Sequence, residues 1–267
     1  MTTSPASIEH NRGGARGLRD ALPVGLQHSV VRAADLAREL RGRLREEPMA
    51  TSVAAFDRLL GGGLPRGCLV ELVGRGSCGR FAALLATLTA ITNTGQAAAL
   101  VDQGDQLDPQ TAVEVGLDLE RLLWLRPRCL PETLAAAELL VSTGFPLVAV
   151  DLGLPPVRGR ATLAAWLRLA RGSIAHRAVV LVGSPYHLSG CAAAAVVTVG
   201  SGRSSWAGTL GNPRLLQGLA ARLEVVRWRG RRPHESGAVA FTLADAAFSP
   251  VAGDMPGETE VRHAQAR

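Results

Sequence analysis

The feature that most constrains the fold is a short apolar run that leads through a glycine-rich loop into a helical stretch. The apolar run is Leu69–Val73, the loop begins at Gly74, and the helical stretch covers residues 80–91. Glycines in such a loop let successive backbone N–H groups turn toward one point at the start of the helix. The junction therefore predicts an α/β domain in which this strand and this helix are neighbours.

The same alternation of apolar runs and helical stretches continues toward the C-terminus. Strands are predicted at 97–102, 121–125, 146–151 and 178–183, and helices at 108–116, 131–142 and 161–174. Apolar strands that alternate with helices are typical of a mostly parallel central sheet flanked by helices on both faces. Later strands, at 193–199, 221–228 and 238–243, have no long helices between them and predict an antiparallel extension of the sheet.

The length and composition allow one large domain with short extensions. The chain has 267 residues, of which 47% are hydrophobic, so it can bury a sizeable core. We predict a mobile N-terminal segment at 1–28, an N-terminal helix at 29–49, a core domain at 50–248 and a flexible C-terminal tail at 249–267. The helix either packs on its own domain or forms an arm that docks on a partner, and the sequence leaves both open.

The charged and metal-binding residue types exclude several kinds of site. All 29 basic residues are arginine and the formal net charge is +6. A GC-rich genome explains the absence of lysine, which nevertheless excludes any mechanism that needs an ε-ammonium group.

The four cysteines form no CxxC pair and the six histidines have no metal-like spacing. We therefore expect no metal site, and we expect the protein to work in the reducing cytoplasm. Polar residues at 92–96 interrupt the apolar stretch at 81–101, so no membrane span is expected.

The glycine-rich loop departs from a working phosphate-binding loop at two positions. Its residues are Gly74, Arg75, Gly76, Ser77, Cys78, Gly79, Arg80 and Phe81. A working loop has the pattern G-x-x-x-x-G-K-[ST], in which the lysine contacts the phosphates and the hydroxyl group holds Mg²⁺. Arg80 keeps the positive charge, so weak anion binding stays feasible, whereas Phe81 cannot bind a metal ion. We therefore expect no ATP binding, no ATP hydrolysis and no cofactor.

Two carboxylates at the ends of predicted strands support this interpretation of the loop. Asp151 follows the apolar run 147–150, as the aspartate of a Walker B strand does, and Asp102 ends the run 97–101. Because the metal ligand of the loop is missing, we predict that both carboxylates are structural remnants.

Several motifs around the loop resemble the entry to the RecA core, and the resemblance covers roughly residues 50–245. The motifs are Ser52, Phe56-Asp57, Gly61–Gly67, Val70–Gly74, Leu100–Asp102, Leu107–Pro109 and Gly116–Asp118. In RecA a catalytic glutamate lies two residues after the aspartate of the second strand, and Gly104 has that place here. Because Arg80, Phe81 and Gly104 replace catalytic residues together, the resemblance implies a non-hydrolysing relative rather than an enzyme.

The loops after the fourth and fifth predicted strands, 152–160 and 184–190, are short, whereas RecA has long DNA-carrying segments there. A small RecA relative with a degenerate loop resembles the ImuA family of bacterial SOS mutagenesis. The resemblance implies a cytoplasmic, nucleoid-associated adaptor in translesion synthesis. Its implied partners are ImuB, RecA and the error-prone DNA polymerase III alpha-type subunit. Two alternatives stay open, namely a weak DNA-dependent ATPase or recombinase and a SulA-type cell-division inhibitor.

The densest basic cluster is a second candidate site. It consists of Arg227, Trp228, Arg229, Arg231 and Arg232. Guanidinium groups pair with phosphates and an indole ring can stack on a base, so the cluster predicts weak contact with DNA or with a partner. A solvated strand end in an arginine-rich protein explains the same residues equally well.

Overall fold

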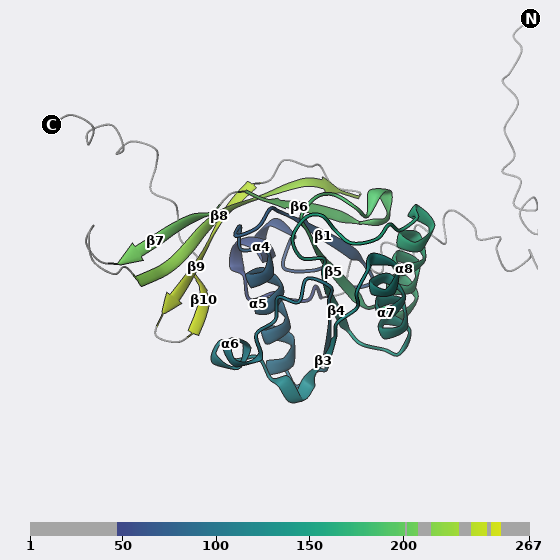
Figure 1. Ribbon diagram of the computed structural model, residues 1–267, viewed down its shortest axis with the longest axis horizontal. Coiled ribbons are helices and arrows are strands. Elements are labelled where there is room, and N and C mark those ends of the chain that lie inside the picture. The colour runs from purple at the N-terminus through teal and green to yellow at the C-terminus, as the bar shows by residue number, and fades with distance from the viewer. Residues whose placement is uncertain (1–46, 201, 208–214, 230–235, 245–246, 252–267) are drawn as a thin grey trace, which may run out of the picture. The chain divides into compact units, whose positions relative to one another are not determined.

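The computed structural model describes residues 47–251, except 201, 208–214, 230–235 and 245–246 (Figure 1). The described strands form one sheet in the order β10-β9-β8-β6-β1-β5-β4-β2-β3, and β7 pairs with β8. Their bounds are β1 Leu69–Val73, β2 Ala98–Asp102, β3 Leu122–Leu125, β4 Leu147–Asp151, β5 Val179–Ser184, β6 Ala195–Val199, β7 Arg203–Ala207, β8 Leu215–Trp228, β9 Ser236–Ala244 and β10 Ala247–Val251.

The central part of the sheet is parallel. β1 lies between β5 and β6, β4 lies between β5 and β2, β3 forms an edge, and every one of these pairs is parallel. Beyond β6 the sheet continues through β8, β9 and β10 in antiparallel pairs. The predicted α/β class, with a mostly parallel sheet and an antiparallel extension, is confirmed. Parallel neighbours need long crossovers, and the helices between the first strands supply them.

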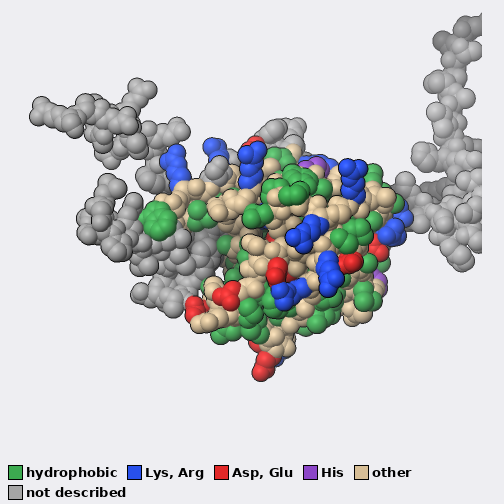
Figure 2. Space-filling model, viewed as in Figure 1, with side chains coloured by type: hydrophobic (Ala, Val, Ile, Leu, Met, Phe, Trp, Pro, Cys, Tyr) green, Lys and Arg blue, Asp and Glu red, His purple; other side chains and the backbone are tan. Residues whose placement is uncertain are grey.

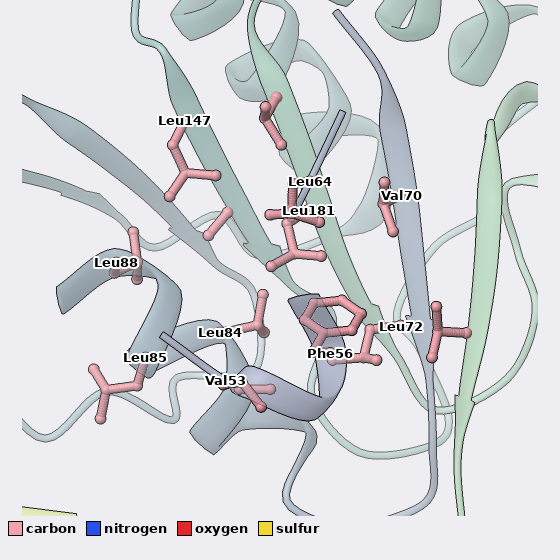
Figure 3. Packing of buried hydrophobic residues seen from close by; sticks show 14 of the residues in the cluster. Val53, Phe56, Leu64, Val70, Leu72, Leu84, Leu85, Leu88, Leu147 and Leu181 are labelled. Atoms are coloured by element: carbon pink, nitrogen blue, oxygen red, sulfur yellow. The ribbon is translucent and has the colours of Figure 1, made fainter. Parts of the chain in front are cut away.

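Helices cover both faces of the parallel strands. They are α4 (Ala54–Leu59), α5 (Arg80–Asn93), α6 (Pro109–Glu114), α7 (Leu130–Ser142) and α8 (Leu163–His176), with 3₁₀ turns η1 (Leu119–Arg121) and η2 (Gly190–Ala192). One hydrophobic core packs the sheet against α4, α5 and α6, and a second packs it against α7 and α8. In the first core, Phe56 of α4 lies between Leu84 of α5 and Leu72 of β1 (Figure 3). No helix within these ranges is long and apolar enough to cross a membrane.

Some element boundaries differ from the predicted ones. Helix α4 is not among the predicted helices, because six residues are too few to show a helical period. The predicted tail begins too early, because Ser249 and Val251 pair with β9 as part of β10. The predicted N-terminal helix extends too far, because Met49 pairs with Leu64 in an isolated bridge. Residues 1–46 and 252–267 lie outside the described ranges, so what the sequence predicts for them stays a prediction.

Candidate functional site: an altered phosphate-binding loop

The glycine-rich loop connects β1 to α5, as predicted. Gly79 is the N-cap residue of α5 and has a left-handed backbone with φ of 89°, a conformation that glycine adopts without strain. Gly74 donates its backbone N–H to the carbonyl of Ser184, at 2.9 Å. A Cβ atom at position 74 would lie 2.5 Å from Sγ of Cys78. The glycines are therefore needed for the shape of the loop itself.

The side chain of Arg80 points into the protein and is only 5% exposed. Its Nη1 donates to the carbonyl of Gly74. Its Nη2 donates to the carbonyl of Gly153 at 2.6 Å and lies 3.5 Å from Oδ1 of Asp151. We call these contacts of Arg80 with Gly74, Gly153 and Asp151 the Arg80 latch. Because the guanidinium is used inside the protein, Arg80 does not present its charge to an anion at the loop as the lysine of a working loop does.

Asp151 is the carboxylate of the Arg80 latch. It ends β4, is fully buried, and accepts a hydrogen bond from the backbone N–H of Gly153 at 3.0 Å. Burial raises the pKa of Asp151 to about 6, although the charge of Arg80 opposes this rise and Asp102 adds to it. Asp151 thus lies where the sequence predicts it, at a strand end beside the loop, and it is paired with a side chain of the same chain.

Asp102 has a structural role at the end of β2. It lies beside Asp151 in the register of β2 and β4. Its carboxylate accepts hydrogen bonds from the backbone N–H groups of Gln106 and Leu107, at 3.0 Å each, and from the indole N–H of Trp124 at 3.3 Å. These bonds hold the turn after β2 and leave little acceptor capacity for a ligand.

The backbone around Asp151 is too close for side chains. A Cβ atom at position 104 would overlap Oδ2 of Asp151 and lie 2.5 Å from Cα of Gly153. A Cβ atom at position 183 would lie 3.3 Å from both Asp151 and Arg80. Gly104 is therefore a packing requirement of this core, and a longer side chain cannot enter without moving β2 or β4.

Phe81 has become part of the hydrophobic core. It is partly buried and packs against the cluster formed by α5 and the sheet. At this position a working loop presents a hydroxyl group to Mg²⁺. No group of three or more potential metal ligands is found among the residues that the structure describes.

The described part of the basic cluster makes contacts within the protein. Arg227 donates from Nη2 to the carbonyls of Gly190 and Ala193, at 2.5 and 3.2 Å. Arg229 donates to the carbonyl of Cys191 at 2.6 Å. Trp228 is half-buried against the first core. Arg231 and Arg232 lie outside the described residues. Arg227 and Arg229 thus stabilise the turn at η2, and the predicted contact with DNA or a partner stays a prediction.

A buried carboxylate in the central strand was not predicted from the sequence. Glu71 of β1 is fully buried. Its oxygens accept hydrogen bonds from the hydroxyls of Ser184 and Ser189, at 2.9 and 2.5 Å, and from the backbone N–H of Leu188 at 2.8 Å. They also lie 2.5 Å from Nδ1 of His187. A single carboxylate within an apolar strand was the available signal, because a buried charge needs several partners.

A parallel sheet with a glycine-rich loop between its first strand and the following helix is the class of α/β fold in which phosphate-binding loops occur. Residues 35–155 match the family described as RecA N-terminal domain, and this span contains the loop, Asp102, Gly104 and Asp151. The chain is 36% identical over 124 residues to Protein RecA of Arthrospira platensis, covering 46% of this chain and 33% of that protein. It is 34% identical to Protein RecA of Prochlorococcus marinus (strain MIT 9515), covering 46% and 32%.

A solved structure shares the fold over a longer part of the chain. The crystal structure of the RadB recombinase matches with a TM-score of 0.55 and 19% identity, and covers 76% of this chain and 99% of that one. The chain spans about a third of the length of the curated relatives it matches. The chain is therefore similar in sequence to RecA N-terminal domains over residues 35–155 and similar in fold to the RadB recombinase.

Proposed function

We propose that this chain is a non-hydrolysing RecA-like adaptor in DNA-damage-induced translesion synthesis. The observation that carries the proposal is the Arg80 latch. The residue at the place of the phosphate-binding lysine is buried and bound to Gly153 and Asp151 of the same chain. Because Arg80 is bound to residues of its own chain, we expect this core to bind its partners without binding a nucleotide.

Two further features of the site support a role without hydrolysis. Phosphoryl transfer needs a metal ion to neutralise developing charge and a group to position the attacking water. Phe81 offers no metal ligand, and Gly104 has no side chain at the place of the RecA glutamate. The crowding around Gly104 means that the glutamate cannot be restored by a single substitution.

The proposed partners are ImuB, RecA and the error-prone DNA polymerase III alpha-type subunit. A RecA-shaped core with no nucleotide switch can bind a partner in one state only. Such a core could occupy the end of a RecA filament without extending it, which would restrain recombination while the polymerase complex assembles.

Co-purification tests this function. The full chain is expressed with a tag in damaged cells, and ImuB and RecA are measured in the retained fraction with and without ATP and Mg²⁺. We expect both proteins to be retained, and retention to be the same in either buffer. Clean failure to retain either one contradicts the adaptor function. Mg²⁺-dependent phosphate release that Asp151→Ala abolishes would support the weak ATPase instead.

A further inference from the structure

Unpaired positive charge gathers on the loops that follow β1, β3 and β4. Four exposed arginines lie there, at Arg75, Arg128, Arg158 and Arg160. Within the part of the chain that the structure describes, no hydrogen bond or ion pair engages their guanidinium groups. Arg126, two residues before Arg128, differs from these four because its guanidinium is paired: it donates two hydrogen bonds of 2.7 Å to the carboxylate of Asp105. The guanidinium groups of the four arginines are therefore available to pair with negatively charged groups of a partner.

One backbone hydrogen bond and one side-chain contact place these loops next to one another. The N–H of Leu130 donates to the carbonyl of Arg158 at 2.8 Å, which places the loop after β4 beside the loop after β3. At its other end the same loop lies against the glycine-rich loop, because a Cβ atom on Gly76 would be 2.9 Å from Cδ2 of Leu154. Arg75 adjoins that contact in the sequence.

Large apolar side chains are exposed on the segment that follows β4, which also carries Arg158 and Arg160. Leu154 is 56% exposed and Leu163, the first residue of α8, is 49% exposed. We name the arginine–leucine surface by its members: Arg75, Arg128, Arg158, Arg160, Leu154 and Leu163. On the face drawn in Figure 2, arginine side chains lie beside hydrophobic ones, with Asp or Glu side chains among them.

We propose that the arginine–leucine surface docks an acidic, leucine-bearing segment of a protein partner. Planar guanidinium groups pair with carboxylates through two parallel hydrogen bonds. Glu132, which accepts a hydrogen bond from the backbone N–H of Arg128, offsets only part of the charge. The exposed leucines favour a polypeptide, because aliphatic side chains bury apolar side chains of a partner. One exposed aromatic ring lies beside the same loop, since the hydroxyl of Tyr186 accepts a hydrogen bond from the backbone N–H of Val157 at 3.3 Å. A base could stack on that ring, so the oligonucleotide is measured alongside the peptide. The proposal rests on the adaptor function, which requires a protein partner.

Peptide binding to the full chain tests the surface. The probe is a fluorescent peptide of about 16 residues with glutamate and leucine at helical spacing, compared with a version that has glutamine for glutamate and with a single-stranded oligonucleotide. We expect the acidic peptide alone to bind. The double substitutions Arg128→Glu with Arg158→Glu, and Leu154→Ser with Leu163→Ser, should each weaken binding by about tenfold or more.

The control variant reverses two exposed arginines elsewhere, Arg203 of β7 and Arg222 of β8, each to glutamate, and should bind the peptide as the natural sequence does. Absence of peptide binding overturns the proposal. Oligonucleotide binding that the arginine substitutions reduce and the leucine substitutions leave unchanged also overturns it, in favour of nucleic acid. If the arginine variant still retains the cellular partners, this surface is wrong and the adaptor function stands. If the natural chain binds peptide but retains no partner, the surface stands and the adaptor function fails.

Discussion

The Arg80 latch predicts that Arg80→Met lowers the free energy of unfolding by about 3–5 kcal/mol at pH 7, the usual cost of removing one member of a buried ion pair. Methionine keeps most of the aliphatic stem but leaves the carbonyls of Gly74 and Gly153 without this donor. It also leaves Asp151 buried without its cation. Because the pKa of Asp151 is already raised to about 6, the carboxyl can take up a proton, and this limits the cost to that range.

Urea unfolding followed by tryptophan fluorescence measures this difference. The matched control is Arg168→Met, which breaks a surface pair with Glu138, at 3.4 Å, whose side chains are 60% and 30% exposed. An exposed ion pair of this kind contributes less than about 1 kcal/mol to the free energy of unfolding. A midpoint for Arg80→Met that shifts no further than the midpoint for Arg168→Met would refute the latch as a stabilising contact.

Three further predictions follow from the residues around the loop. The carboxyl of Asp151 has its pKa raised from 3.8 to about 6 in the folded protein, so the folded state binds the proton more tightly, and the contribution of Asp151 to stability falls as pH rises between these values; the difference in urea midpoint between the natural chain and Asp151→Asn should therefore change over that range in favour of the variant as pH rises, and a constant difference would argue against it. Gly104→Ala should lower the melting temperature more than Gly144→Ala, because position 104 is crowded whereas position 144 has open space but a φ of 95°; equal shifts in calorimetry would contradict the crowding. Glu71→Gln should lower the free energy of unfolding by about 1–3 kcal/mol and should speed backbone amide hydrogen exchange at residues 184–190. Unchanged exchange there would show that Glu71 does not hold this segment.

Much of the fold follows from local patterns in the sequence. Leu69–Val73 and Leu147–Asp151 are buried strands because both are apolar between turn residues, and the structure has them where the pattern predicts. Asp108 caps α6 through the N–H of Thr111, as its place before Pro109 predicts. β7 was not predicted because Arg203–Ala207 is mostly exposed, and its pairing with β8 depends on hydrogen bonds rather than on an apolar period.

The site was only partly predictable, because its decisive contacts join residues far apart in the chain. The spacing of the loop predicts that Arg80 starts a helix, but not that its side chain turns toward Asp151, which is 71 residues away. The partners of Glu71 are 113 to 118 residues away. The same limitation affects Arg227. Its place in a basic cluster suggested an external ligand, whereas in the structure its guanidinium donates a hydrogen bond to the backbone carbonyl of Gly190.

Calorimetric ATP titration and a phosphate-release assay on the purified full chain measure whether the altered loop binds or hydrolyses ATP. An Arg80→Lys, Phe81→Thr variant is measured alongside. We expect the natural sequence to give no Mg²⁺-dependent binding heat and background phosphate release. We expect the variant to stay without turnover, because Gly104 still lacks the group that positions water. Mg²⁺-dependent turnover by the natural sequence, lost in Asp151→Ala, would contradict the account.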